Sequence, residues 1–115
     1  MSDIQKLTQQ ILKFRNKRDW KHFHYPKDMA ISLALEAAEV LEHFQWKTQE
    51  EVEAYLKTHK THIADELADV LWWVLLMNHD LNIDVMRAFD KKLKINEEKY
   101  PVDKAKGTHK KYTEL

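Results

Sequence analysis

The sequence predicts an all-α chain that folds as a single domain, and three observations support this. Glycine occurs once and proline twice in 115 residues, so the turns that separate short strands are scarce. Apolar residues recur at helical spacing along most of the chain. A chain of this length buries roughly two-thirds of its unfolded surface, which suits one domain over residues 1–115.

Four main helices are expected, the first two joined by an irregular connector. The first helix spans residues 3–17, where apolar residues follow a helical period. Residues 18–26 form the connector, because Pro26 disfavours a helix just before it. The second helix is expected over about residues 27–45.

The second half of the chain carries clear helix-start signals. Thr48 and Glu51 form a capping box, which predicts a short polar helix to about residue 57. Thr61 is expected to cap the third main helix, over about residues 61–79. Asp84 begins the fourth, which ends near Tyr100, before a proline. Residues 101–115 are predicted to be a lysine-rich tail.

Composition excludes several classes of protein. The formal net charge is zero, whereas a protein that binds polymeric nucleic acid is usually basic. Cysteine is absent, which removes disulfides and thiolate zinc sites. The longest apolar run, residues 70–77, is too short to span a membrane, and the first residues lack the apolar core of a secretory signal. We therefore expect a soluble, cytoplasmic protein that does not bind membranes.

The single glycine also limits how the chain could hold a nucleotide. A P-loop or a dinucleotide-binding turn needs several glycines so that the backbone can approach phosphate. Gly107 stands alone near the end of the chain. Any nucleotide phosphate must therefore be held through a metal ion and side chains.

Two acidic pairs in apolar helical surroundings predict a metal site. Glu36 and Glu39 lie three residues apart in the second helix, as do Glu66 and Asp69 in the third, so each pair projects from one side of its helix. Buried carboxylates that face one another are costly without cations. Oxygen ligands select hard ions, so Mg²⁺ is expected, with Mn²⁺ as a possible substitute.

Two other interpretations fit these acids less well. Charged residues at this spacing usually form a solvated helix face, but here both pairs are flanked by apolar residues. A di-iron carboxylate bundle requires Glu-x-x-His on two helices, and the chain has no such motif. His43 follows Glu39 by four residues, which is the wrong phase for that site.

The apolar residues of the third helix predict that the chain forms an oligomer. This helix is apolar on three sides, and only Glu66, Asp69 and Trp73 share a polar face. A helix that is apolar nearly all round is a buried one, and one small chain can hardly cover it. We therefore expect a homo-oligomer, a dimer or a tetramer, whose central bundle contains the second and third helices of more than one copy. Trp72 is interpreted as core packing.

The motifs together resemble the all-α nucleoside triphosphate pyrophosphohydrolases, the MazG-like group, and within it the dCTP pyrophosphatase branch. The resemblance covers essentially the whole chain. It is carried by Arg18-Asp-Trp-x-x-Phe-His-x-Pro26, Glu36-x-x-Glu39, Phe44-Gln-Trp-Lys47, Asp65-Glu-Leu-Ala-Asp-Val70, Ile95-Asn-x-x-Lys-Tyr-Pro101 and Lys111-Tyr-Thr-Glu-Leu115.

This resemblance implies a MazG-like helical bundle, commonly a tetramer, that hydrolyses a nucleoside triphosphate to the monophosphate and pyrophosphate. The four acids would be the Mg²⁺ ligands. The family positions that line the base and sugar pocket are Trp20, Trp46 and Trp73. The family positions that approach phosphate are Lys92, Asn96 and Lys99. Ile11 stands where a dCTP-specific relative can carry a histidine, which should soften the base preference.

The residue types suggest which side chains act in the reaction and which bind the substrate. A carboxylate not saturated by metal can accept the proton of the attacking water, and Glu39 is the first candidate, with Glu36 second. His24 is expected near the pocket. Deoxycytidine triphosphate, or a modified form of it, is the expected substrate. The alternatives are a broad-specificity enzyme that removes damaged nucleotides and a non-enzymatic helical interaction module.

Overall fold

The computed structural model describes all 115 residues, and it contains helices but no strand. This confirms the all-α prediction with four main helices. The chain divides into two compact units, Met1–Ile83 and Asp84–Leu115, which are described separately below. No helix combines the length and the apolar character that a membrane span requires.

Helix α1 spans Asp3–Lys17, as the sequence predicts. Its start is fixed by a capping box in which the Ser2 hydroxyl accepts a hydrogen bond from the Gln5 backbone N–H (3.2 Å) and the Gln5 side chain accepts one from the Ser2 N–H (2.9 Å). Ile11 and Arg15 are the residues of α1 that become buried. Its inner face therefore carries one apolar and one charged side chain.

The connector after α1 contains a short 3₁₀ helix, η1 (Lys21–Phe23), and leads into α2 (Pro26–Glu42). Pro26 is the first residue of α2, where its missing N–H costs no hydrogen bond. Helix α2 ends three residues earlier than predicted. The chain turns after Glu42 and Trp46 takes a left-handed backbone conformation (φ 69°), so the residues up to Gln45 do not continue the helix.

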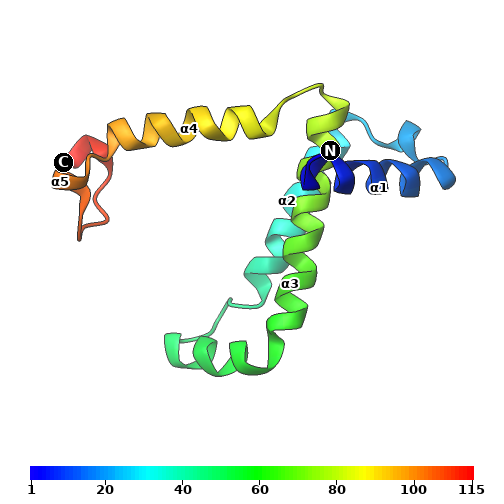
Figure 1. Cartoon of the computed structure of the whole chain (residues 1–115). Coiled ribbons are helices and arrows are strands. Elements are labelled where there is room, and N and C mark those ends of the chain that lie inside the picture. The colour runs from blue at the N-terminus through cyan, green and yellow to red at the C-terminus, as the bar shows by residue number, and fades with distance from the viewer. The chain divides into compact units, whose positions relative to one another are not determined.

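Helix α3 spans Gln49–Asp80 as one continuous element. Thr48 caps it with Glu51 in the predicted box, but the predicted boundary at Thr61 is wrong. No proline or glycine interrupts residues 49–80, so the backbone hydrogen bonds run on through the polar stretch. Figure 1 shows that α3 turns sharply in its first half rather than ending there.

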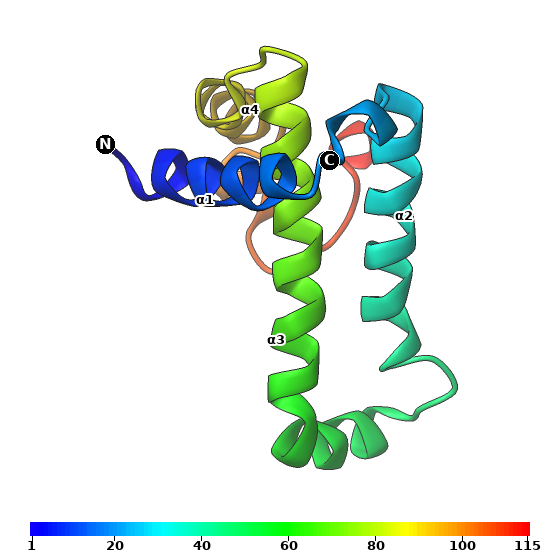
Figure 2. The same ribbon diagram turned by 90° about the vertical axis from the view of Figure 1, so that its right-hand side faces the viewer.

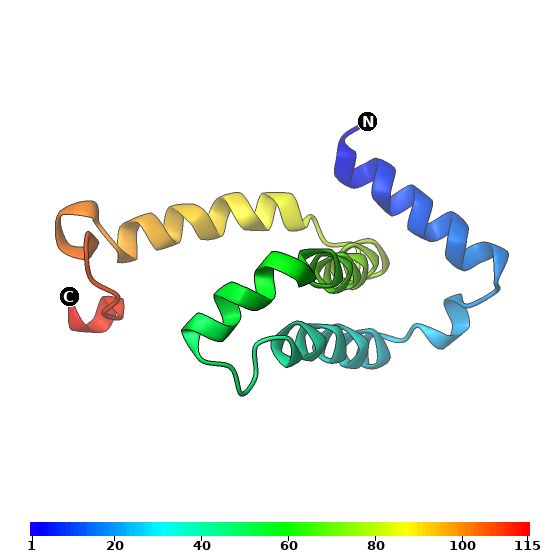
Figure 3. The same cartoon turned by 90° about the horizontal axis from the view of Figure 1, so that it is seen from below.

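Helix α3 is the element on which the rest of the first unit packs. Helix α2 runs beside it, and α1 crosses it near its carboxyl end (Figure 2). Viewed from below, α2 and the long part of α3 lie next to each other with their axes in a similar direction (Figure 3). The buried core is small and consists of one residue of α1, one of α2 and two of α3, namely Ile11, Met29, Leu75 and Leu76.

Many apolar side chains of the first unit remain exposed in the single chain. On α2, Leu35 and Leu41 are 61% and 63% exposed, and on α3, Leu67 and Leu71 are 53% and 42% exposed. These four side chains lie on the two helices that carry the predicted metal ligands. The single chain thus buries only one side of each of these helices.

The second unit is built from α4 (Val85–Lys99), the short helix α5 (Val102–Ala105) and a 3₁₀ turn, η2 (Tyr112–Glu114). Asp84 caps α4 through the Arg87 N–H (3.1 Å), as predicted. Tyr112 packs edge-on against Tyr100 (ring centroids 6.0 Å apart) and under the Lys99 ammonium (4.7 Å). These contacts order part of the segment that the sequence presents as an irregular tail.

Proline at position 62 distinguishes a continuous α3 from two helices that meet at Thr61. If Thr61 capped a new helix, residue 62 would be its first position and would accept proline. In a continuous helix the His62→Pro variant loses a backbone hydrogen bond and clashes with the preceding turn, which costs about 3 kcal/mol. Urea unfolding measures this loss. Gln49→Pro is the matched control, because position 49 is the true first residue of α3, and equal stability of both variants would contradict the continuous helix.

Candidate metal and nucleotide site

Three carboxylates converge between α2 and α3. Each of Glu36, Glu39 and Asp69 offers one oxygen, and these oxygens all lie within 4.8 Å of one another. Glu36 and Glu39 are three residues apart on α2, so both face α3. Asp69 reaches the same point from α3. The helix pairing therefore brings together acids from both of the pairs that the sequence singles out.

The electrostatics of this cluster favour a bound cation. The pKa of Glu36 is raised, first by burial, then by a hydrogen bond with Glu39 and by the negative charges of Glu39, Asp69 and Glu66. Ligands on opposite sides of a Mg²⁺ ion are about 4 Å apart, which is comparable to the spread of these oxygens. Three hard oxygen donors with unrelieved mutual repulsion fit a divalent cation.

Glu66 has a different partner from the other acids. Its carboxylate contacts Nε2 of His43, and Nδ1 of the same ring contacts the hydroxyl of Tyr55. The structure thus groups three of the four predicted ligands and places Glu66 beside them, held by a histidine. This role of His43 differs from the iron ligation against which its sequence position argues. Its spacing of seven residues from Glu36 places it on the same face of the chain as the acids, and this signal could have identified it.

An aromatic cavity of about 320 Å³ adjoins the acidic cluster. Asp69 belongs to both, because it lines the cavity as well as contributing to the cluster. The other lining residues come from α1, the connector and α3, and they are Phe14, Arg15, Trp20, His24, Trp72 and Trp73. The predicted pocket residues Trp20, His24 and Trp73 therefore share one cavity.

Edge-to-face contacts between rings shape this cavity. Phe14 packs against Trp20 and Trp72, with centroid distances of 5.9 and 5.2 Å. His24 lies 5.2 Å from Trp73 in a similar arrangement. Trp72 packs on the core, as predicted, but it also lines the cavity. A flat, aromatic cavity of this kind suits a planar ring with polar edges.

The remaining predicted site residues lie elsewhere. Trp46 is 92% exposed and does not line the aromatic cavity. Lys92, Asn96 and Lys99 are exposed on α4 in the second unit. Trp46 is therefore separate from the predicted pocket residues that share the cavity, and the roles of the three α4 residues stay predictions.

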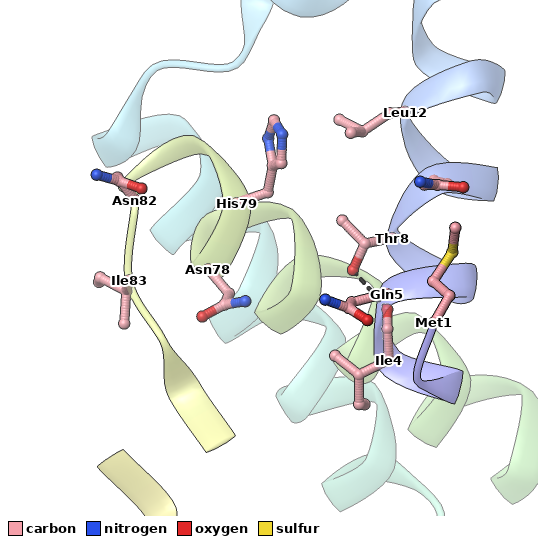
Figure 4. Close-up of a pocket in the computed structure, with 10 residues that line it drawn as sticks. Met1, Ile4, Gln5, Thr8, Leu12, Asn78, His79, Asn82 and Ile83 are labelled. Carbon is pink, nitrogen blue, oxygen red and sulfur yellow. Dashed lines mark hydrogen bonds between the residues drawn. The ribbon is translucent and has the colours of Figure 1, made fainter. Parts of the chain in front are cut away.

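A second cavity, of about 480 Å³, lies between α1 and the carboxyl end of α3. Figure 4 shows that its polar lining consists mainly of amides and of the Thr8 hydroxyl, which donates to the Ile4 carbonyl (2.7 Å). No carboxylate lines it. It therefore lacks the ligands that a metal-dependent phosphate site requires.

One buried ion pair joins α1 to the end of α3 next to the aromatic cavity. Arg15 is 2% exposed, and its Nη1 and Nη2 donate to the two carboxylate oxygens of Asp80 at 2.6 and 3.0 Å. Burial alone would raise the pKa of Asp80, but the hydrogen bonds from Arg15 and His79 outweigh it and hold that pKa below its ordinary value. The sequence analysis missed this pair, whose members are 65 positions apart.

The comparisons with known proteins place the chain in a family. The model of the MazG-like family matches residues 31–115. The proteins named dCTP pyrophosphatase 1 of Rattus norvegicus and Homo sapiens are each 32% identical over 117 aligned positions, which cover the whole chain and 67% of each relative. A crystal structure of a pyrophosphatase from Archaeoglobus fulgidus is 34% identical and superposes with a TM-score of 0.82, over 88% of this chain and 94% of that one.

The Arg15–Asp80 pair predicts how stability changes in acid. The pKa of Asp80 is lowered in the folded state, so its ionised carboxylate stabilises the fold. This stabilisation is complete above the ordinary pKa of 3.8 and is lost as pH falls through the lower pKa of the folded state. Asp80→Asn should therefore cost about 3 kcal/mol near pH 7, and this difference should shrink towards zero in strong acid, where the parent is protonated too.

Urea unfolding of parent and variant between pH 7 and pH 2 measures this difference. Asp90→Asn, which alters an exposed carboxylate on α4, is the control and should show little difference at any pH. A cost of Asp80→Asn that stays the same down to pH 2 would contradict the role of the ionised pair.

Proposed function

The chain belongs to the MazG-like family, and from this we propose that it hydrolyses nucleoside triphosphates to the monophosphate and pyrophosphate in a Mg²⁺-dependent reaction. The observation that carries the proposal is the position of Asp69. This residue belongs to the acidic cluster and also lines the aromatic cavity. A base held in the cavity would therefore leave its phosphates close to the carboxylates.

The acids have two roles in this proposal. Glu36, Glu39 and Asp69 would hold Mg²⁺, or Mn²⁺ in its place, and Glu66 would complete the set from its position beside His43. When bound, the ion supplies the positive charge that offsets the charge of the phosphates. Glu39 is the proposed general base that accepts the proton of the attacking water, and Glu36 is the second candidate.

We further propose deoxycytidine triphosphate, or a form of it modified on the base, as the preferred substrate. The relatives named above carry dCTP in their names, and the aromatic lining of the cavity suits a planar base. Trp20 and Trp73 offer aromatic contact, which is worth on the order of 1–3 kcal/mol per base. A broad preference that includes damaged nucleotides is the second candidate, because stacking alone discriminates poorly between bases.

The complete site requires more than one copy of the chain in this proposal. Leu35, Leu41, Leu67 and Leu71 leave an apolar surface on both ligand-bearing helices, and a second copy of these helices would cover it. Trp46 and the α4 residues Lys92, Asn96 and Lys99 would then reach the nucleotide of a neighbouring chain. A dimer and a tetramer both satisfy this requirement. The cytoplasmic location stays a prediction.

Removal of charge from the cluster tests the proposed chemistry. Glu39→Gln and Asp69→Asn should each lower kcat by at least about a hundredfold, equivalent to about 3 kcal/mol of transition-state stabilisation, while far-ultraviolet circular dichroism shows a folded helical protein. Glu42→Gln, on the exposed side of α2, is the matched control and should remain near the parent. Activity within about tenfold of the parent for both cluster variants would exclude these acids from the mechanism.

A panel of deoxynucleoside triphosphates with chromatographically resolved products tests the substrate. We expect dCTP and its 5-substituted forms to give the highest kcat/KM, because a base that lacks a polar partner in the proposed slot leaves a buried group unpaired. The products should be monophosphate and pyrophosphate. Equal kcat/KM for purine and pyrimidine substrates would contradict the pyrimidine slot, and release of single phosphates would contradict the reaction type.

Light scattering at micromolar concentration tests the assembly. The parent should have the mass of a dimer or a tetramer, because burial of the exposed leucines is favourable by about 25 cal/mol per Å². Leu67→Lys places a charge on this surface and should shift the protein towards smaller species. A monomeric parent at this concentration would contradict the proposed shared site.

A further inference from the structure

Arg15 is the one charged residue that is buried, and its ion pair leaves part of the guanidinium free. Nη1 and Nη2 donate to Asp80, whereas Nε is buried without a hydrogen-bond partner. An unpaired buried donor is costly, so in native proteins such a group usually has a role. Arg15 lines the aromatic cavity, but its Nε atom is fully buried, so the guanidinium can act on a ligand there only through a neighbouring side chain.

His24 lies next to this guanidinium. Its Nδ1 is 3.5 Å from Nη1 of Arg15. A guanidinium can only donate hydrogen bonds, so Nδ1 must be the acceptor in this contact and the ring hydrogen must lie on Nε2. Burial and the charge of Arg15 lower the pKa of His24, against an opposing effect of Asp80, which agrees with a neutral ring.

The contact with Arg15 therefore gives His24 a defined hydrogen-bonding character. In neutral imidazole the two nitrogens exchange roles unless a neighbour selects one form. Here Asp80 holds Arg15 in place, and Arg15 selects the form with Nε2–H. His24 lines the cavity with its ring against Trp73, so the form that Arg15 selects gives the cavity one defined donor, Nε2–H of His24.

We propose that Arg15, anchored by Asp80, is a positioning residue that fixes the tautomer of His24, and that the resulting Nε2–H donor selects a base with an acceptor at N3. This inference rests on the proposed nucleotide substrate. Cytosine presents O2 and N3, which are both acceptors. Thymine and uracil present O2 but carry a hydrogen on N3, which would face a donor and leave it unpaired. The site should therefore prefer cytosine to the other pyrimidines.

The tautomer can be observed directly by NMR of protein labelled with ¹⁵N-histidine. In the parent, Nδ1 of His24 should show the shift of an unprotonated nitrogen and Nε2 that of a protonated one. The double variant Arg15→Met/Asp80→Leu removes both charges together, so that neither is left buried and unpaired, and its His24 should become a mixture of tautomers. Lys17→Met is the control, because it removes an exposed cation from the same helix and should leave the His24 signals unchanged.

A binding experiment tests the consequence for the base. Tryptophan fluorescence titrations with dCMP and dTMP measure the preference of the parent, which should favour dCMP by about tenfold. The double variant and His24→Leu should bind the two monophosphates about equally. Since the monophosphates are not hydrolysed, this result does not depend on activity.

The outcomes separate this inference from the proposed function. A parent His24 with its hydrogen on Nδ1, a tautomer that the double variant leaves unchanged, or a parent that binds dCMP and dTMP equally would each overturn the inference. If the parent shows the expected tautomer and preference but hydrolyses no triphosphate, the proposed reaction is wrong while the recognition of cytosine stands.

Discussion

The repulsion among the carboxylates between α2 and α3 is the constraint on which the rest of the first unit depends. Helices that carry like charges on facing sides separate unless something offsets those charges. Glu36 bears this repulsion, since burial and its acidic neighbours raise its pKa. A bound cation would convert this repulsion into attraction, so the feature that weakens the pairing of α2 with α3 is also the one that allows phosphate chemistry.

The Arg15–Asp80 pair attaches α1 to α3. The core of the first unit contains few buried side chains, and α1 meets α3 only near its carboxyl end. Two hydrogen bonds from one guanidinium fix that crossing in both position and direction. They also close one wall of the aromatic cavity. The same contact that attaches α1 therefore sets the chemical character of the pocket next to the acids.

The sequence predicted what depends on local pattern and failed where distant contacts decide. The bounds of α1, the capping boxes and the faces of the acids follow from helical period and from side chains a few residues apart. The continuity of α3 through Thr61 did not follow, because threonine is favoured as an N-cap and is a weak residue inside a helix, so the local signal indicated a helix start. The pairing of Arg15 with Asp80 joins separate helices, and no local signal specifies it. Helical spacing places His43 on the face of the acids, but it does not specify the pairing with Glu66 on α3.

The most direct test of this account is the free energy of unfolding of the parent and of Glu36→Gln at pH 7, each with and without Mg²⁺. Without the ion, Glu36→Gln should be the more stable protein, because the raised pKa of Glu36 means that its charge opposes folding at this pH. With Mg²⁺ the parent should gain more stability than the variant, so that the difference in their free energies of unfolding becomes smaller or changes sign. A parent that Mg²⁺ leaves unchanged, or that is the more stable of the two without it, would contradict the account.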